Sequence, residues 1–348
     1  MLWTLKKIWY RVFQFVLTSV MYLLPWRQPE LLTGPGSIKK LPAFIKSKGV
    51  NNVLIVTDSV LRKLGVLDSF LAACDAAGLK GVVYDGVEPN PSIENIEEAR
   101  KLYVDNKCDG IVAFGGGSAM DCAKVAGARV VKPRQSVTQM GGTLRVLKKL
   151  PPFFAVPTTA GTGSETTIAA VVTDRATHHK YAVQDLCLIP HYAVLDPELT
   201  IGLPPHITSA TGMDALTHAV EAYTNLFAPK STDKLAEETV RLIFENLEKV
   251  YQDGTDLTAR YNMQLAAFYG GAAFTRACVG YVHGVAHTLG GLYGTPHGLA
   301  NAVILPYVME DFGPAVYHKL ARLADIVGID GKNDEEKAKA FILEIRRM

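Results

Sequence analysis

The stretch DGIVAFGGGSAMDCAKVAGA, residues 109–128, joins an apolar strand-like run to a helix-like run through three consecutive glycines. Gly115, Gly116 and Gly117 carry no side chain, so the backbone of this turn can approach a ligand closely. Free N–H groups and the positive end of a following helix favour a phosphate, and Ser118 can add a hydroxyl donor. The spacing is not GxGxxG, so a purely steric role for the glycines stays open.

Short apolar runs alternate with helix-like segments on both sides of this stretch. The alternation predicts a parallel sheet with helices on both faces and right-handed crossovers, and such sheets bind ligands beyond the carboxyl ends of their strands. The predicted strands are residues 52–59, 80–87, 109–117, 152–158, 169–174 and 191–196, and the predicted helices are residues 64–78, 93–106 and 118–128.

The pattern changes after Asp196-Pro197. Strand-like runs stop, and residues 233–253 carry apolar side chains at the i, i+3, i+4 and i+7 spacing of a helix. We therefore expect an α/β domain over residues 31–200 and an all-helical domain over residues 201–348. The chain stops inside an amphipathic segment, so we expect the helical domain to be C-terminally truncated.

Composition limits the class of protein. A chain of 348 residues with 48% hydrophobic and 20% charged residues is globular and long enough for two domains. A net charge of +2 without a long basic run argues against nucleic acid as a partner. The five cysteines are odd in number and form no CxxC pair, so we expect a reducing, cytoplasmic location.

Residues 1–30 form a separate extension that is rich in apolar side chains. Lys6 and Lys7 precede the apolar stretch, Arg11 interrupts it, and no A-x-A cleavage site follows. Trp9 and Phe13 lie at helical spacing, so an amphipathic helix is the better interpretation. We expect this helix to pack against its own chain or a sister subunit; a membrane-surface helix and a targeting segment are the alternatives.

Two further segments suit nucleotide binding. The loop PTTAGTGSE, residues 157–165, follows a predicted strand and offers the hydroxyls of Thr158, Thr159 and Thr162 for phosphate, ribose or base; a solvent-exposed turn is the alternative. Asp58 ends the first predicted strand, where a carboxylate can accept from ribose hydroxyls and repel a 2′-phosphate. Asp58 is equally suited to cap the next helix.

The pattern that best indicates chemistry is a set of carboxylate and imidazole side chains. Asp214 and His218 are four residues apart and share a helix face, as do His283 and His287, and His297 follows in TPHG. Oxygen and nitrogen donors without thiolate suit Fe²⁺, Zn²⁺ or Mn²⁺, and ligand type alone does not choose among them. Two such pairs plus a third site favour a metal centre over structural histidines.

Four motifs together resemble one family. AVPTTAGTGSETT, GGGSAMDCAK, ATGMDALTHAVEAY and VHGVAHTLGGLYGTPHGLANAVILP closely resemble the iron-containing, or group III, alcohol dehydrogenases, in the family's order and spacing. The resemblance runs from about residue 34 to the end. It implies a Rossmann-like nucleotide domain, an all-helical metal-binding domain, and Fe²⁺ (or Zn²⁺) with NAD as cofactors.

The resemblance also implies roles for individual residues. The metal ligands would be Asp214, His218, His283 and His297, so Asp214 would also be catalytic, and His287 would be a proton relay near the substrate. The cofactor-binding residues would be Asp58 with a preference for NAD, together with Asn90, Gly116, Gly117, Ser118, Thr158, Thr159, Thr162 and Lys180.

The expected activity is a metal-dependent, NAD-linked alcohol dehydrogenase or aldehyde reductase acting on small primary alcohols, as a homodimer or larger homo-oligomer. The alternatives are a zinc-dependent glycerol dehydrogenase, a dehydroquinate-synthase-like enzyme, or a catalytically silent assembly subunit. A synthase would need basic residues to hold a substrate phosphate near the metal, and residues 280–300 contain no lysine or arginine.

Overall fold

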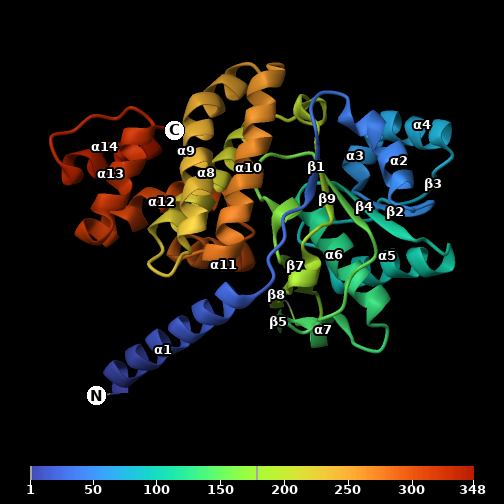
Figure 1. Cartoon of the computed structure of the whole chain (residues 1–348), viewed down its shortest axis with the longest axis horizontal. Coiled ribbons are helices and arrows are strands. Elements are labelled where there is room, and N and C mark those ends of the chain that lie inside the picture. Colours follow the sequence, from blue (N-terminus) through green and yellow to red (C-terminus); the bar gives the residue numbers. More distant parts are fainter. Residues whose placement is uncertain (1, 178) are drawn as a thin grey trace.

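A computed structural model describes residues 2–177 and 179–348 of the chain. Its α/β part and its helical part lie side by side, and one long helix extends from the body (Figure 1). The predicted fold class, a Rossmann-like parallel sheet followed by an all-helical region, is confirmed.

The main sheet of the described residues is parallel throughout, with strand order β1-β9-β6-β4-β2-β3. Its strands are β1 (Glu30–Thr33), β2 (Asn52–Val56), β3 (Lys80–Tyr84), β4 (Gly110–Gly115), β6 (Phe153–Pro157) and β9 (Tyr192–Leu195). Successive side chains of a strand point to opposite faces, so one set packs under α2 and α4 and the alternate set under α5 and α6. The helices of this part are α2 (Ser37–Ser47), α3 (Ser59–Lys63), α4 (Asp68–Ala77), α5 (Ile93–Asp105), α6 (Gly117–Val131) and α7 (Val137–Met140).

The direction in which successive strands are added to the sheet reverses between β2 and β4. From β2 the chain moves outward to β3, and then returns to the other side of β2 for β4, β6 and β9. The carboxyl ends of β2 and β4 therefore flank the point where strand order reverses, which is where such sheets bind nucleotides. Asp58 follows β2, and the glycine turn follows β4.

Residues 169–174 form a strand, as predicted, but the prediction that this strand belongs to the main parallel sheet is wrong. This strand, β7 (Ala169–Asp174), pairs antiparallel with β8 (His179–Gln184), and β8 pairs parallel with β5 (Gly142–Thr143). The short connection between β7 and β8 allows a direct reversal, whereas a parallel strand would need a long crossover. Strands β1, β5 and β8 were not predicted because they are short or rich in polar side chains.

The helical part shares one large core. Its helices are α8 (Pro205–Thr224), α9 (Lys230–Gln252), α10 (Leu257–Ala277), α11 (Tyr281–Tyr293), α12 (His297–Phe312), α13 (Tyr317–Ile326) and α14 (Asp334–Arg347). Helix α8 is buried continuously from Gly212 to Thr224, so its polar side chains enter the interior. A buried polar group needs partners, and these come from α11 and α12.

The loop after β6 packs tightly against the helical part. Gly163 adopts a left-handed φ of +59°, and a Cβ there would lie 2.5 Å from the Cα of Gly271 on α10. A larger residue would have to push the loop away from α10. Gln264 on α10 also donates to the carbonyl of Asp196 at 3.1 Å, so this helix contacts the carboxyl end of the sheet twice.

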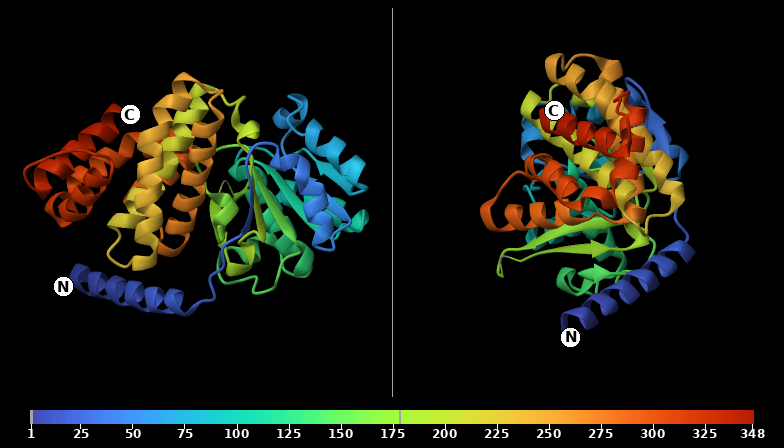
Figure 2. Two further views of the ribbon diagram at one scale, coloured as in Figure 1. Left: turned by 45° about the horizontal axis from the view of Figure 1, so that its top comes forward. Right: turned by 90° about the vertical axis from the view of Figure 1, so that its left-hand side faces the viewer.

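The extension forms α1 (Leu2–Leu23). Of its two expected positions, packing against its own chain is wrong for the described side chains from Trp3 to Val16, and packing against a sister subunit stays a prediction. All described side chains from Trp3 to Val16 are exposed, and both views of Figure 2 show the helix outside the body. The linker after α1 is anchored, because Arg27 donates to the carbonyl of Ile189 and the Arg276 guanidinium lies 5.7 Å over the Trp26 ring. Among the described residues no helix is both long and apolar enough to cross a membrane.

Candidate metal centre and dinucleotide site

Three helices bring a carboxylate and two imidazoles together. Asp214 on α8, His283 on α11 and His297 on α12 each offer one ligand atom within 4.8 Å of the others. Asp214 Oδ1 lies 3.4 Å from His297 Nε2 and 3.7 Å from His283 Nε2. These residues are separated by up to 83 positions in the chain, from 214 to 297, so only the packing of the helices makes the cluster.

Glu221 and Asn301 surround this cluster. Glu221 Oε2 lies 2.5 Å from His283 Nδ1, and Glu221 Oε1 accepts from the Val282 backbone N–H at 2.7 Å. With Nδ1 donating to Glu221, the neutral form of His283 presents its Nε2 lone pair to the cluster. The Asn301 amide nitrogen lies 2.7 Å from Asp214 Oδ1 and 3.2 Å from the Nε2 atoms of both His283 and His297.

Sequence reasoning did not identify Glu221 and Asn301, although helical spacing could have. Glu221 is seven residues after Asp214, and Asn301 is four residues after His297, so each shares a helix face with a candidate ligand. Both side chains are buried, and the Asn301 amide is fully so. Polar residues at these spacings are candidates for orienting a ligand rather than for core packing.

His218 lies beside the cluster rather than within the group of three. Its ring stacks on Phe274 at 4.0 Å and on His283 at 4.5 Å between centroids. The ring is buried, and its Nδ1 atom has no hydrogen-bond partner. The His218 ring therefore adjoins the candidate ligand His283, but it offers no atom within the group of three converging ligand atoms.

The charges of the cluster are coupled. Burial would raise the pKa of Asp214, but the imidazoles of His218, His283 and His297 hold it well below its usual range. Burial would lower the pKa of His283, but the carboxylates of Asp214 and Glu221 raise it to about 9. Burial lowers the pKa of His218 to about 3 despite the carboxylate of Asp214. Two buried carboxylates thus create a site that attracts positive charge.

His287 lies one turn along α11 from His283. Its ring centroid is 4.9 Å from that of His297 and 6.0 Å from that of His283. Desolvation, followed by the positive fields of His297 and His283, lowers the pKa of His287 to about 4. The ring is exposed, so a neutral imidazole at this position can exchange a proton with solvent.

The residues present fit a divalent ion such as Fe²⁺ or Zn²⁺. The donor set contains one carboxylate and imidazole nitrogens, which suit these metals, and it lacks thiolate. The imidazole of His218, whose ring centroid lies 4.5 Å from that of His283, is a further nitrogen-bearing side chain next to this group. Asn301 Nδ2 makes contacts to three acceptors that a metal ion would also use.

The glycine turn and the threonine loop lie against each other. A Cβ on Gly117 would lie 3.0 Å from the Thr162 Cγ2 atom, and a Cβ on Gly116 would lie 3.4 Å from the Thr159 hydroxyl. Thr158 is buried and donates its backbone N–H to the carbonyl of Gly115 at 3.1 Å. Two loops that sequence analysis treated separately therefore form one surface at the start of α6.

The remaining predicted cofactor residues are grouped around this surface. Asp58 Oδ1 accepts from the N–H groups of Val60 and Leu61, so the capping role is present, while Asp58 Oδ2 faces the glycine turn. The backbone N–H of Asn90 lies 3.2 Å from the Ser118 hydroxyl. Asn90 also adopts a left-handed φ of 57°, which Asn tolerates better than most residues.

Lys180 connects the α/β part to the metal cluster. Its ammonium group donates to the carbonyl of Gly290 on α11 at 3.4 Å. Its charge also contributes to lowering the pKa of both His287 and His297. Lys180 is therefore within electrostatic range of the cluster and comes from the small sheet beside the threonine loop.

A buried lysine, which sequence analysis did not identify, connects the two loops. Lys124 on α6 is fully buried and donates to the Ser164 hydroxyl at 3.0 Å and to the Thr167 hydroxyl at 2.9 Å. Ser164 in turn donates to Asp121 at 3.0 Å. Burial lowers the pKa of Lys124 to about 8, although Asp121 and Glu165 oppose the shift. A lysine in a helix of small residues was the available signal.

Comparisons with known proteins agree with this architecture. Residues 28–197 match the family described as iron-containing alcohol dehydrogenase, and residues 208–348 match the C-terminal part of the Fe-containing alcohol dehydrogenase family. Alcohol dehydrogenase 4 of Schizosaccharomyces pombe is 42% identical over 85% of this chain and 69% of its own length. The 1,3-propanediol dehydrogenase of Citrobacter freundii is 39% identical over 97% of this chain and 86% of its own length.

A solved structure shows the same fold with a nucleotide. Sulfoacetaldehyde reductase from Bifidobacterium kashiwanohense in complex with NAD⁺ has a TM-score of 0.83 and 30% identity, over 93% of this chain and 85% of its own. The parallel sheet, the helical region and the cluster of carboxylate and imidazoles define a metal-linked oxidoreductase. The chain belongs to the family of iron-containing alcohol dehydrogenases.

Proposed function

We propose that this enzyme interconverts small primary alcohols and their aldehydes with NAD(H), at an Fe²⁺ centre held by Asp214, His218, His283 and His297. Zn²⁺ is the alternative ion. The observation that carries the proposal is the convergence of Asp214, His283 and His297 from three helices, with ligand atoms within 4.8 Å of one another. The ion would supply Lewis-acid polarisation of the substrate oxygen.

Two side chains would handle protons in the proposed reaction, one by accepting the hydroxyl proton of the alcohol and one by fixing the tautomer of His283. In alcohol oxidation bound NAD⁺ would supply the hydride acceptor for the carbon-bound hydrogen, so the hydroxyl proton must leave by another route. His287, neutral because its pKa is lowered, accepts that proton and releases it to solvent. Glu221 keeps His283 in the tautomer whose Nε2 is a donor to the ion.

The cofactor would lie along the carboxyl ends of β2 and β4. Gly116, Gly117 and Ser118 would hold the pyrophosphate at the start of α6, and Thr158, Thr159 and Thr162 would contact it from the adjoining loop. Asp58 would accept from the ribose hydroxyls and disfavour NADP. Asn90 and Lys180 would lie toward the nicotinamide end, which the contact of Lys180 with α11 supports.

We also propose the finer features of organisation. The chain divides into an extension at residues 1–30, a dinucleotide domain at 31–200 and a metal domain at 201–348. It acts as a homodimer or larger homo-oligomer in the cytoplasm. Support comes from the family resemblance and the unpaired cysteines, which suit a reducing compartment.

The test uses metal-stripped protein that is reloaded anaerobically with Fe²⁺ or Zn²⁺. NADH formation from a panel of short alcohols should depend on the added metal and disappear in Asp214→Ala. The control Asp105→Ala removes an exposed carboxylate on α5 and should keep wild-type turnover. Metal and NAD binding without turnover in either direction would contradict the proposal.

A further inference from the structure

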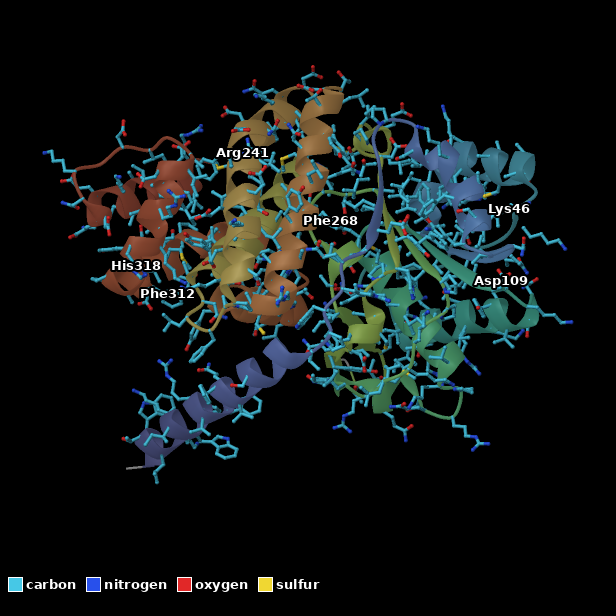
Figure 3. All side chains as sticks on the ribbon, viewed as in Figure 1. Lys46, Asp109, Arg241, Phe268, Phe312 and His318 are labelled. Atoms are coloured by element: carbon cyan, nitrogen blue, oxygen red, sulfur yellow. The ribbon has the colours of Figure 1, made fainter. Side chains whose placement is uncertain are left out.

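The surface least explained by the enzyme's chemistry is that of α1. Its described apolar side chains are more than half exposed, including Trp9 at 67%, Phe13 at 54% and Val16 at 51%. Figure 3 shows α1 extending from the body, with its side chains spreading away from the rest of the chain over most of its length. Exposed aromatic and aliphatic side chains in such a concentration mark an interaction surface.

The helix has two distinct faces. Lys7, Arg11 and Gln14 recur at spacings of four and three, so they share one polar face. The opposite face carries Leu5, Trp9, Val12, Phe13 and Val16. With 22 residues the helix is about 33 Å long at 1.5 Å per residue, so it presents a long apolar face beside a narrow cationic one.

The charges of α1 are all of one sign. The helix contains Lys6, Lys7 and Arg11 and no aspartate or glutamate. Two copies of α1 packed through their apolar faces would leave Lys7 and Arg11 pointing outward, without a counter-charge on either helix. An anionic lipid surface supplies the missing counter-charge to every cation and accepts the aromatic side chains at the level of its headgroups.

We propose that α1 binds the surface of an anionic phospholipid bilayer, lying in the plane of the interface with its Trp9–Phe13–Val16 face buried among the acyl chains. Lys7 and Arg11 then face the lipid phosphates, and Lys6 at the edge of the apolar face extends its ammonium group toward them. The anchored linker at Trp26 and Arg27 holds the enzyme body at the membrane surface.

The whole chain can be tested with vesicles of phosphatidylcholine alone and with vesicles that also contain the anionic lipid phosphatidylglycerol. Co-sedimentation should show at least roughly tenfold stronger partitioning onto the anionic vesicles, weakened by high salt. The three tryptophans are Trp3, Trp9 and Trp26, so tryptophan emission reports on α1 and its linker. In a Trp26→Phe background, emission should shift to the blue on binding.

Charge and apolar contributions are separated by two pairs of variants. K7E/R11E should lower partitioning onto anionic vesicles at least about tenfold, whereas K39E/K40E, the same charge change at exposed sites on α2, should not. F13Q/V16Q should also abolish binding with the cations intact, whereas L64Q/V104Q at exposed sites of the body should not.

Two results would overturn the proposal. One is vesicle binding that neither α1 variant weakens. The other is an absence of vesicle binding together with self-association, measured by light scattering, that F13Q/V16Q abolishes, because α1 would then pair with a second copy. Alcohol-dependent NADH formation should be unchanged in all four variants, which confirms that each is folded.

Discussion

The carboxylate of Glu221 accepts from the His283 ring at 2.5 Å and from the Val282 backbone N–H at 2.7 Å. One side chain of α8 thus holds the first turn of α11 and the orientation of a candidate ligand on it. This relationship makes the metal centre depend on a residue that need not touch the metal.

Glu221→Gln should weaken metal binding by about 10- to 100-fold. Its amide has one oxygen for these two N–H groups, so its NH₂ would face either the Val282 N–H or the His283 Nδ1. An NH₂ that faces Nδ1 favours the imidazole tautomer that carries its proton on Nε2, where it blocks the lone pair. The measurement is competition with a chelator of known affinity. The control is Glu237→Gln, which changes a carboxylate that accepts a hydrogen bond from the Tyr223 hydroxyl away from the ligand atoms, and it should leave metal affinity unchanged. Equal affinity in both variants would contradict the positioning role.

Asn301→Leu should destabilise the metal-free protein more than the metal-loaded protein. Without metal, Asp214 loses the 2.7 Å hydrogen bond from the amide and is left buried, at a cost of about 1–3 kcal/mol. With metal, the carboxylate has another partner. Denaturant unfolding with chelator and with added Fe²⁺ measures the difference. Asn262→Leu, which breaks a hydrogen bond to Asn246 away from the cluster, should cost the same in both states.

Asp58→Ser should raise the kcat/KM for NADP relative to NAD about tenfold or more. Relieving repulsion between unit charges near a protein surface is worth about 1–4 kcal/mol at contact distances. Serine can retain the helix cap, so stability should change little, whereas Asp58→Ala should lose about 1 kcal/mol with the cap. Asp75→Ser, on the exposed side of α4, is the charge-matched control. An unchanged coenzyme ratio would exclude Asp58 as the determinant.

Glu165 should make stability depend on pH. Burial raises the pKa of Glu165 from 4.5 to about 7, although a hydrogen bond from its own backbone N–H and the charge of Lys124 oppose this shift. The folded state then keeps a proton that the unfolded state has released. The contribution of Glu165 to the free energy of unfolding should therefore fall as pH rises from about 4.5 to about 7 and level off above, by up to about 3 kcal/mol.

Glu165→Gln removes this titration, so the difference in the free energy of unfolding between wild type and variant should fall as pH rises from about 4.5 to about 7. Urea unfolding between pH 4.5 and 8 measures both proteins, and Glu94→Gln on the exposed face of α5 should keep the wild-type slope. A slope that persists in Glu165→Gln would assign the pH dependence to other groups.

Much of the candidate site could be predicted from sequence because its parts are local. A glycine turn between a strand and a helix, a threonine loop after a strand, and carboxylates and imidazoles four residues apart are all visible along the chain. Each depends on backbone geometry over a few residues, which neighbouring side chains determine.

The rest depends on which helices meet. Glu221 and Asn301 became recognisable only when α8, α11 and α12 converged around Asp214, since hydrogen bonds between them span 62 to 87 residues of chain.

The fold class, the candidate ligands and the candidate nucleotide loops can be predicted along the chain, since they follow from periodicity and short-range spacing. Three features appear only in the folded chain: β7 leaves the main sheet, His218 stacks between Phe274 and His283, and the described side chains of α1 from Trp3 to Val16 lie exposed. Those outcomes depend on long-range packing, in which surfaces distant in the chain compete for the same neighbours.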